Sequence, residues 1–473
     1  MRNQKSEVRS HPPQAPRLKI SGTSLSGGQK SEVINDLAQL LKNKVDAWEI
    51  FYSFQNGLSI EAKDGKVDAF KVSSNKGVGL RVLKDKKIGF SFASALSKES
   101  LRELVENAVQ GSRGVTPDEF LSLPSPKKAA SDKPMLFDYS LDNVAEEDKI
   151  QKAIMLEQAA RGFDPRVTKV RKASYSETVF ESRLVNSTGI DTANKATFVS
   201  SNIMAVAEDR GDSQMGWEMD MSHFAKDVDV KKVGRDAAKR AVDMLGARTI
   251  ATVKCPVVIE NIIVGEFLEI LAPSFCADNL SKGKSMLKGK KGQKVFSEKV
   301  TIWDDGLMQN GWSTSQYDGE GMPRQKTCLV DKGACVNYLY DTYWAKREKT
   351  ESTGNAARSH FKSISTVGIS NLYMEKGDVD FDRLLKQMDR GLLITNILGA
   401  HTANPITGDF SFGVSGFWIE GGMVSHPVRG AAIAGNMLKL FEKADVVGSD
   451  LRFIGNIGTP SLLVSGMEVS GGS

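Results

Sequence analysis

The residue types that most often carry enzyme chemistry are sparse in this chain. It has five histidines, at positions 11, 223, 360, 401 and 426, and no two of them have the spacing of a metal-binding pair on one helix. The sequence also lacks the G-x-S-x-G nucleophile elbow and the Walker A loop. These patterns give no ground for a histidine zinc site, a serine hydrolase or a P-loop NTPase.

Acidic residues offer the other candidate chemistry. The stretch WDDGLMQNGWSTSQYDGEGMP contains Asp304, Asp305, Asp318 and Glu320. Two neighbouring carboxylates could bind a divalent ion or act as an acid and a base. Most of them stand beside glycine, where aspartate commonly makes a turn by accepting a hydrogen bond from nearby backbone. The local sequence favours turns, and an autonomous enzyme that uses these carboxylates with a divalent ion remains an alternative.

The main cationic segment is SKGKSMLKGKKGQK, residues 281–294, which contains six lysines. Its glycines could let backbone N–H groups hold phosphate, and its lysines could bind nucleic acid. The segment has no aromatic residue on which a base could stack. Because charge runs usually face water, we favour a solvated loop, and binding of nucleic acid through Lys282–Lys294 is the alternative.

The elements that must position these residues follow an α+β order, since helices and strands do not alternate as a regular βαβ repeat. Residues 1–29 are polar and rich in proline, which predicts a disordered tail. We expect an N-terminal domain of mixed helices and strands over residues 30–250 and a strand-rich C-terminal domain over residues 251–473. The stretch GVGLRV at Gly77 lacks a third glycine at dinucleotide-binding spacing, so it predicts a strand with close backbone packing.

Composition is that of an ordinary globular chain. The 473 residues carry a net charge of +5, which is small for this size and does not favour nucleic acid as the main partner. The four cysteines form no C-x-x-C pair, so neither zinc-ribbon nor thioredoxin spacing is present. A few scattered thiols in a long chain suggest a reducing compartment. No window is apolar enough to span a membrane, and the N-terminus has no secretory pattern. We therefore expect a cytoplasmic protein.

The stretch NPITGDFSFGVSGFWIEGG, residues 404–422, combines a turn with a strand. Asn404-Pro405 and Gly408-Asp409 predict the turn. From there, one strand face carries Phe410, Phe412, Val414 and Trp418, and the other carries Phe417 and Ile419. Apolar residues on both faces predict a buried strand.

Several of these segments resemble the TldD/PmbA (TldE) family. GVGLRVLKDKKIGFSFASALSKESLRELVENAV is similar to its N-terminal domain, and residues 404–422 to part of its C-terminal block. Residues 301–359 are similar to its central block, with DDG, D-x-E-G-x-P, YLYD and STGN in order. The resemblance runs from about residue 31 to the end.

The resemblance implies a zinc-dependent peptidase of two subunits that acts on unstructured peptides, with roles in peptide maturation and antitoxin turnover. TldD-type subunits carry H-E-x-x-x-H on a helix and a cysteine from the C-terminal region. TldE/PmbA-type subunits lack these ligands and pair with the TldD type. In this chain the helix GEFLEILAPSF would place Leu268, Glu269 and Pro273 at the motif positions, and the last cysteine is Cys335. We therefore expect no catalytic or metal-binding residue here, and zinc in a TldD-type partner.

Such a subunit would contribute half of a chamber and part of a peptide groove. A strand-rich half could bind a peptide by adding it to a sheet edge. The candidate groove or interface residues lie in two segments: Asp318, Glu320, Gly321 and Pro323, and Asn404, Gly408, Phe410 and Phe412. The alternative is a homodimeric peptide- or ligand-binding protein without protease activity.

Overall fold

The computed structural model describes residues 24–129 and 134–472, so most of the predicted tail lies outside the described residues. The first helix, α1 (Gly27–Leu41), begins inside the segment assigned to that tail. It starts there because the Ser26 hydroxyl accepts a hydrogen bond from the Gln29 backbone, while the Gln29 side chain accepts one from Ser26. This capping box satisfies two of the backbone N–H groups that a helix start leaves free.

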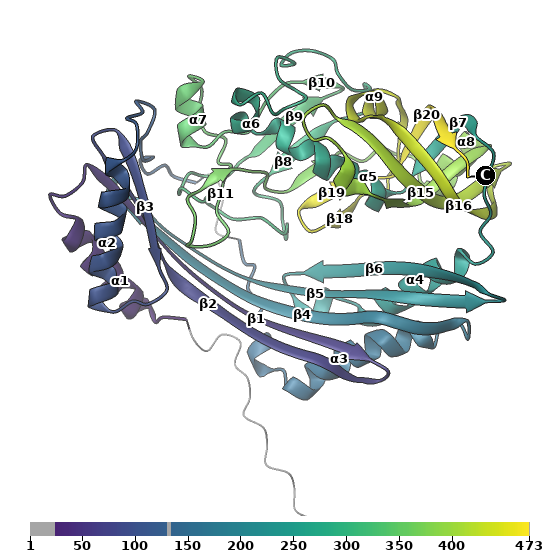
Figure 1. Cartoon of the computed structure of the whole chain (residues 1–473), viewed down its shortest axis with the longest axis horizontal. Helices are drawn as coiled ribbons and strands as arrows, with labels where there is room; N and C mark the ends of the chain where they lie inside the picture. The colour runs from purple at the N-terminus through teal and green to yellow at the C-terminus, as the bar shows by residue number, and fades with distance from the viewer. Residues whose placement is uncertain (1–23, 130–133, 473) are drawn as a thin grey trace, which may run out of the picture.

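The first half of the chain is built on one long antiparallel sheet, which we call the N-terminal sheet (Figure 1). Its strand order is β3-β2-β1-β4-β5-β6. The strands are β1 (Ala47–Lys63), β2 (Lys66–Lys84), β3 (Lys87–Ala93), β4 (Val167–Asn186), β5 (Asp191–Asp209) and β6 (Asp212–Ser222). Asp64 and Gly65, both with positive φ, form the β1–β2 turn, as the sequence predicts.

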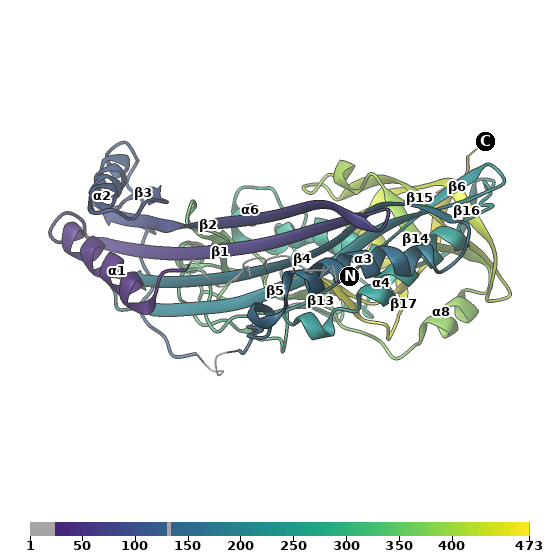
Figure 2. The same ribbon diagram turned by 90° about the horizontal axis from the view of Figure 1, so that it is seen from below.

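Four helices cover the outer face and one end of this sheet. Figure 2 shows α3 and α4 lying along the long strands, while α1 and α2 stand at the end formed by β1–β3. The helices α2 (Lys98–Arg113), α3 (Glu146–Arg161) and α4 (Val230–Asp243) bury apolar stripes that join one core with the outer face of the sheet. That leaves the inner, concave face of the sheet toward the second half of the chain (Figure 1).

The second half contains a closed barrel and a smaller sheet. In the barrel, β16-β15-β14-β7-β20 are neighbours in this order, β16 also pairs with β20, and β17 extends the sheet beyond β20. Its strands are β7 (Val253–Ile259), β14 (Gly391–Leu398), β15 (Asp409–Glu420), β16 (Met423–Asn436), β17 (Ala444–Val447) and β20 (Leu462–Ser470).

The smaller sheet, which we call the central sheet, has the order β10-β9-β8-β13-β19-β18. Its strands are β8 (Ile302–Asp305), β9 (Lys326–Asp331), β10 (Ala334–Cys335), β13 (Leu372–Met374), β18 (Arg452–Ile454) and β19 (Ile457–Thr459). The remaining short elements are α6 (Ala277–Ser281), α7 (Thr342–Arg347), α8 (Phe381–Met388), α9 (Met437–Glu442) and the pair β11 (Ala356–Ala357) and β12 (Thr366–Val367). The fold is α+β, as predicted.

Helix α5 (Asn261–Leu271) packs within a core shared by the barrel and the central sheet. Phe267 of α5 contacts Phe410 and Phe412 of β15, with ring centroids 5.3 and 5.5 Å apart. Val414 and Trp418 belong to the same core, whereas Ile419 and Phe417 pack on the other face of β15 against α8. The buried strand predicted for this segment is therefore confirmed on both faces.

Within residues 24–129 and 134–472, the structure contains no helix that is long and apolar enough to cross a membrane.

Candidate functional site

A cavity of about 390 Å³ lies between the concave face of the N-terminal sheet and the second half of the chain. Its floor follows from strand register, because residues directly opposite each other in neighbouring strands share a face. Gln55 of β1 pairs with Phe180 of β4, and Ser182 of β4 pairs with Asn194 of β5. All four residues line the cavity.

The second half supplies the other wall. It is formed by residues 312–319 and 357–359, together with Arg324 and Ile369. Trp312 packs edge-on against Phe198 of β5, with ring centroids 4.8 Å apart. The cavity therefore combines aromatic side walls with two guanidinium groups.

His223 joins the two halves beside this cavity. The imidazole is buried, with its Nδ1 2.7 Å from the Thr197 carbonyl oxygen and its Nε2 3.0 Å from the Gly311 carbonyl oxygen. Both ring nitrogens thus lie within hydrogen-bond distance of backbone carbonyl oxygens, one from each half of the chain. This histidine is therefore engaged in structure rather than open to a metal.

A buried ion network fixes the second half to the N-terminal sheet. Arg81 of β2 donates to Glu49 Oε2 at 2.6 Å and to Glu320 Oε1 at 3.0 Å. Arg358 donates from Nη1 to Glu49 Oε1 at 2.7 Å, and its side chain is fully buried. Buried charges persist only when paired in this way, so the four residues form a buried polar contact between the halves.

Close backbone packing surrounds the network. A Cβ at Gly79 would lie 2.3 Å from the Phe361 carbonyl oxygen, and one at Gly77 would lie 2.4 Å from the Phe361 ring. Only glycine lets the segment after β11 rest directly on β2. The close packing predicted for GVGLRV is confirmed.

The acids near this junction have shifted pKa values. Burial, reinforced by the charge of Glu320, raises the pKa of Asp318 to about 7 and that of Asp341 to about 7. Burial alone would raise the pKa of Glu320 as well, but the charge of Arg81 and hydrogen bonds from Thr342 and Ser365 lower this pKa overall. The pairing with Arg81 thus decides which of the clustered carboxylates stays ionised.

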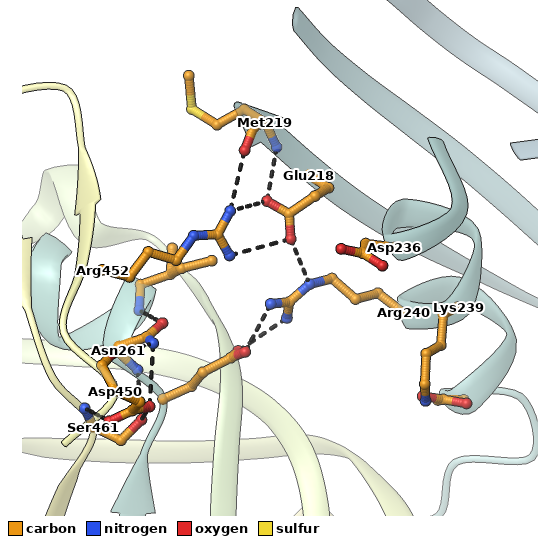
Figure 3. Close-up of polar contacts among 12 residues, drawn as sticks. Glu218, Met219, Asp236, Lys239, Arg240, Asn261, Asp450, Arg452 and Ser461 are labelled. Atoms are coloured by element: carbon orange, nitrogen blue, oxygen red, sulfur yellow. Dashed lines mark hydrogen bonds and ion pairs between the residues drawn. The ribbon is translucent and has the colours of Figure 1, made fainter. Parts of the chain in front are cut away.

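Helix α5 is held in place at a second junction between the halves (Figure 3). Arg240 of α4 donates to both carboxylate oxygens of Glu260, at 2.9 and 2.7 Å, and to Glu218 of β6. Arg452 of β18 also donates to Glu218. Because Glu260 immediately precedes α5, this network fixes the start of the helix relative to the N-terminal sheet.

The same helix start is tied to the C-terminal loops. Asn261 donates from its backbone to Ser461 Oγ at 3.0 Å and from its side chain to Asp450 Oδ2 at 3.1 Å. Ser461 in turn donates to Asp450 (Figure 3). The position of α5 is thus determined by residues far apart in sequence.

Three domain models of one family together match most of the chain. They describe PmbA/TldA metallopeptidase domain 1 over residues 48–112, the central domain over residues 139–245 and the C-terminal domain over residues 252–471. A PmbA homologue of Buchnera aphidicola subsp. Baizongia pistaciae is 30% identical, over 75% of this chain and 78% of its own length. The chain belongs to the PmbA/TldD metallopeptidase family.

Other family members support this assignment. Metalloprotease PmbA of Escherichia coli O157:H7 is 26% identical over 93% of this chain and 96% of its own. A solved modulator of DNA gyrase from Thermotoga maritima is 27% identical, with a TM-score of 0.86 over 93% of this chain and all of that one. TldE from Thermococcus kodakarensis shares the fold, with a TM-score of 0.85 at 24% identity.

The residues present on α5 do not fit the zinc that a PmbA/TldD metallopeptidase implies. Leu268 is completely buried in the core, Glu269 is exposed, and Pro273 lies in the turn after the helix. Glu266 and Glu269 are the only acidic residues of α5, which has no histidine or cysteine, and a zinc site needs three or four ligands. Nowhere in the described parts of the chain do three His, Cys, Asp or Glu side chains gather in a way that could hold a metal.

The structure separates the predicted groove residues. Asp318 lines the cavity. Asp318, Glu320 and Gly321 are buried at the junction between the halves. Pro323 is half-buried and forms a β-bridge with Tyr317. At the barrel, Asn404 is exposed and Gly408 buried, whereas Phe410 and Phe412 belong to the core. Of the two segments, only the turn at Asn404 presents a free surface.

The other acidic candidates are committed to separate partners. Asp304 accepts hydrogen bonds from Ser370 and Asn355, and Asp305 accepts one from the Leu307 backbone. Since Glu320 pairs with Arg81, these carboxylates do not converge on one ion. The turn interpretation holds for Asp318, which accepts from the backbones of Glu320 and Met322. In the lysine run, Lys282, Lys284, Lys288, Lys291 and Lys294 are exposed and Lys290 is half-buried, in agreement with a solvated loop.

Sequence reasoning missed the arginines of the junction and the cavity. Arg81 is the only charged residue within the apolar stretch GVGLRVL, and a lone charge in such a stretch indicates a buried, paired side chain. Arg324, Arg358 and Glu49 carry no such local mark. Arg358 and Glu49 lie 309 positions apart, and the cavity wall opposite Arg324 comes from the N-terminal sheet, so only the fold reveals these contacts.

Proposed function

We propose that this chain is a PmbA/TldE-type subunit that carries no zinc and pairs with a TldD-type metallopeptidase subunit. The observation that supports this most strongly is the state of α5. Two polar networks fix the start of this helix relative to the rest of the chain. Its side chains nevertheless do not include enough metal-binding groups to form a zinc site. Without a zinc site, the chain has no means to acidify a water by that mechanism.

The proposed substrate is an unstructured peptide. The concave face of the N-terminal sheet continues beyond the cavity as a row of small polar side chains, with Ser59, Ser176 and Ser200 opposite one another. The same face carries Trp217 and Met215 on β6, which are 39% and 55% exposed. Small hydroxyls beside exposed apolar groups suit an extended chain of varied sequence.

We also place the protein in the cytoplasm. Cys255, Cys276, Cys328 and Cys335 are all free thiols, and burial raises the pKa of each. Unreactive, unpaired cysteines fit a reducing compartment.

The test is co-expression with a TldD-type protein from the same genome, followed by size-exclusion chromatography with light scattering and a peptidase assay on an unstructured peptide. We expect a one-to-one complex whose activity is lost when the partner's H-E-x-x-x-H histidines are replaced. Glu269→Gln in this chain leaves that activity unchanged. Absence of a complex, together with full activity of the partner alone, would refute the proposal.

The cavity favours one other candidate function, a homodimeric peptide- or ligand-binding protein without protease activity. Light scattering of the chain alone addresses it. A stable homodimer that does not exchange with the TldD-type protein would favour this second function.

A further inference from the structure

We propose that the cavity between the N-terminal sheet and residues 312–319 binds a ligand with one carboxylate next to an apolar group, and that Arg324 holds the carboxylate. The C-terminal residue of a peptide is one such ligand, and a small aromatic acid is another. If the ligand is a peptide, this inference rests on the proposed function, and the C-terminal residue is the part of the peptide that this chain recognises.

Arg324 lines the cavity as a cation whose counter-charge is missing. Its guanidinium donates to Ser315 Oγ at 2.9 Å and to the Gly354 carbonyl oxygen at 3.3 Å, and both acceptors are neutral. By contrast, Arg81, Arg240 and Arg358 each donate to at least one carboxylate. In the described parts of the chain, no carboxylate forms an ion pair with Arg324.

The environment of Arg324 disfavours an unpaired charge. Burial lowers its pKa overall, although the charges of Asp318 and Asp304 oppose this shift. A buried ion that lacks a partner is costly, and an anion that enters the cavity would offset this cost. A second cation stands at the same wall, because Arg358 lines the cavity and its Nη2 is buried without a hydrogen-bond partner.

The cavity favours a ligand with a single negative charge. Asp318 shares the wall with the two arginines and is itself an acid. When Asp318 is ionised, it would repel a phosphate dianion more strongly than a carboxylate, which brings a single negative charge to Arg324. A planar carboxylate also matches the paired N–H groups of a guanidinium.

The rest of the cavity suits an apolar group. Phe180 and Phe198 rise from the sheet, and Trp312 faces them from the second half. The volume of about 390 Å³ falls within the range of sites for small molecules or one or two residues of a peptide. An aromatic or aliphatic side chain next to the carboxylate would fill the space between these rings.

Three probes and the isolated chain test the proposal, with binding followed by tryptophan fluorescence and by calorimetry. The probes are glycyl-glycyl-phenylalanine, the same tripeptide as its C-terminal amide, and 3-phenylpropionate. We expect the free tripeptide acid to bind at least about tenfold more tightly than the amide, since the amide removes the charge that Arg324 recognises. Tighter binding of phenylpropionate than of the tripeptide would identify a small aromatic acid as the ligand.

Variants connect the effect to this site. Arg324→Gln removes the preference for the acid over the amide, and Arg324→Lys retains part of it. Arg113→Gln, at an exposed arginine in the last turn of α2, keeps the full preference. If an Arg324 variant fails to fold, the comparison of acid with amide on the unmodified chain still decides.

Equal binding of acid and amide, or no binding of either acid at millimolar concentration, overturns the proposal. These measurements use the chain without a partner. A failure here is therefore distinct from a failure of the two-subunit proposal, which is read from complex formation.

Discussion

At the scale of single residues, the junction between the halves depends on which carboxylates keep their charge. Arg81 lies between Glu49 and Glu320, and these acids accept its hydrogen bonds. Asp341 lies close to Glu320 but lacks a cation of its own, so burial and the neighbouring charge raise its pKa to about 7. The cluster therefore has one ion-paired side and one side that titrates near neutral pH.

This arrangement predicts a pH-dependent stability. Because the pKa of Asp318 and of Asp341 rises from 3.8 to about 7 on folding, the folded chain binds more protons than the unfolded chain between these values. The free energy of unfolding should therefore fall as pH rises from about 4 to about 7, by up to about 1.4 kcal/mol per pH unit for each group. Thermal melting between pH 5 and pH 8 measures the slope.

Asp341→Asn should flatten this slope, since asparagine keeps the helix-capping acceptor and removes the charge. Asp380→Asn is the matched control: Asp380 caps α8 as Asp341 caps α7, but it is exposed. An unchanged slope in Asp341→Asn would contradict this account of the junction.

At the scale of elements, the second half of the chain packs directly against the backbone of strand β2. β2 presents Gly77 and Gly79 to Phe361, and the N-terminal sheet can approach that segment only because both positions lack a Cβ. The same strand then provides Arg81 two residues later, on the same face. One short stretch thus provides both the steric fit and the charge at this contact.

Gly79→Ala should destabilise the chain by about 1–3 kcal/mol, because the added methyl group would meet the Phe361 carbonyl and force the two elements apart. Chemical denaturation measures the change. Gly114→Ala is the control, since Gly114 ends α2 at φ −85° and a Cβ there would meet nothing within 4 Å. Equal stability of the two variants would show that the contact at β2 is looser than the structure indicates.

At the scale of the whole molecule, two polar networks hold the halves together at different places. The first joins β1 and β2 to the segments around Glu320 and Arg358. The second joins β6 and α4 to Glu260 and Arg452, next to the start of α5 (Figure 3). The cavity lies beside the first network, and α5 lies beside the second. A change in the orientation of the two halves would therefore alter both the cavity and the position of α5.

Arg240→Gln should loosen the second network, because it leaves Glu260 without its partner. We expect trypsin to cleave the connecting segment 244–252, which contains the exposed Arg248, about tenfold faster, equivalent to about 1.4 kcal/mol. Arg235→Gln, an exposed position on the same helix, should leave the rate unchanged. Equal cleavage of both variants would indicate that Arg240 does not hold the halves together.

The sequence by itself determined features that depend on neighbours along the chain. Alternation along β15 predicted which face carries Phe410 and Phe412 and which carries Ile419, and the structure places them in two different cores. The glycines of GVGLRV predicted close packing for the same reason, since a missing side chain is a local fact. The family motifs and the missing histidines of α5 could likewise be read directly from the letters.

Only the tertiary structure decided what the polar residues do. Asp318 and Glu320 belong to a segment whose sequence predicts a surface turn, yet both are buried. Glu320 is ion-paired there with Arg81, which lies 239 positions away in sequence. No local pattern encodes such a pairing. The same holds for Arg324 and its cavity, whose walls come from β1, β4, β5 and residues 312–319. Burial faces follow from periodicity, whereas ion pairs and cavities follow from which distant segments the fold brings together.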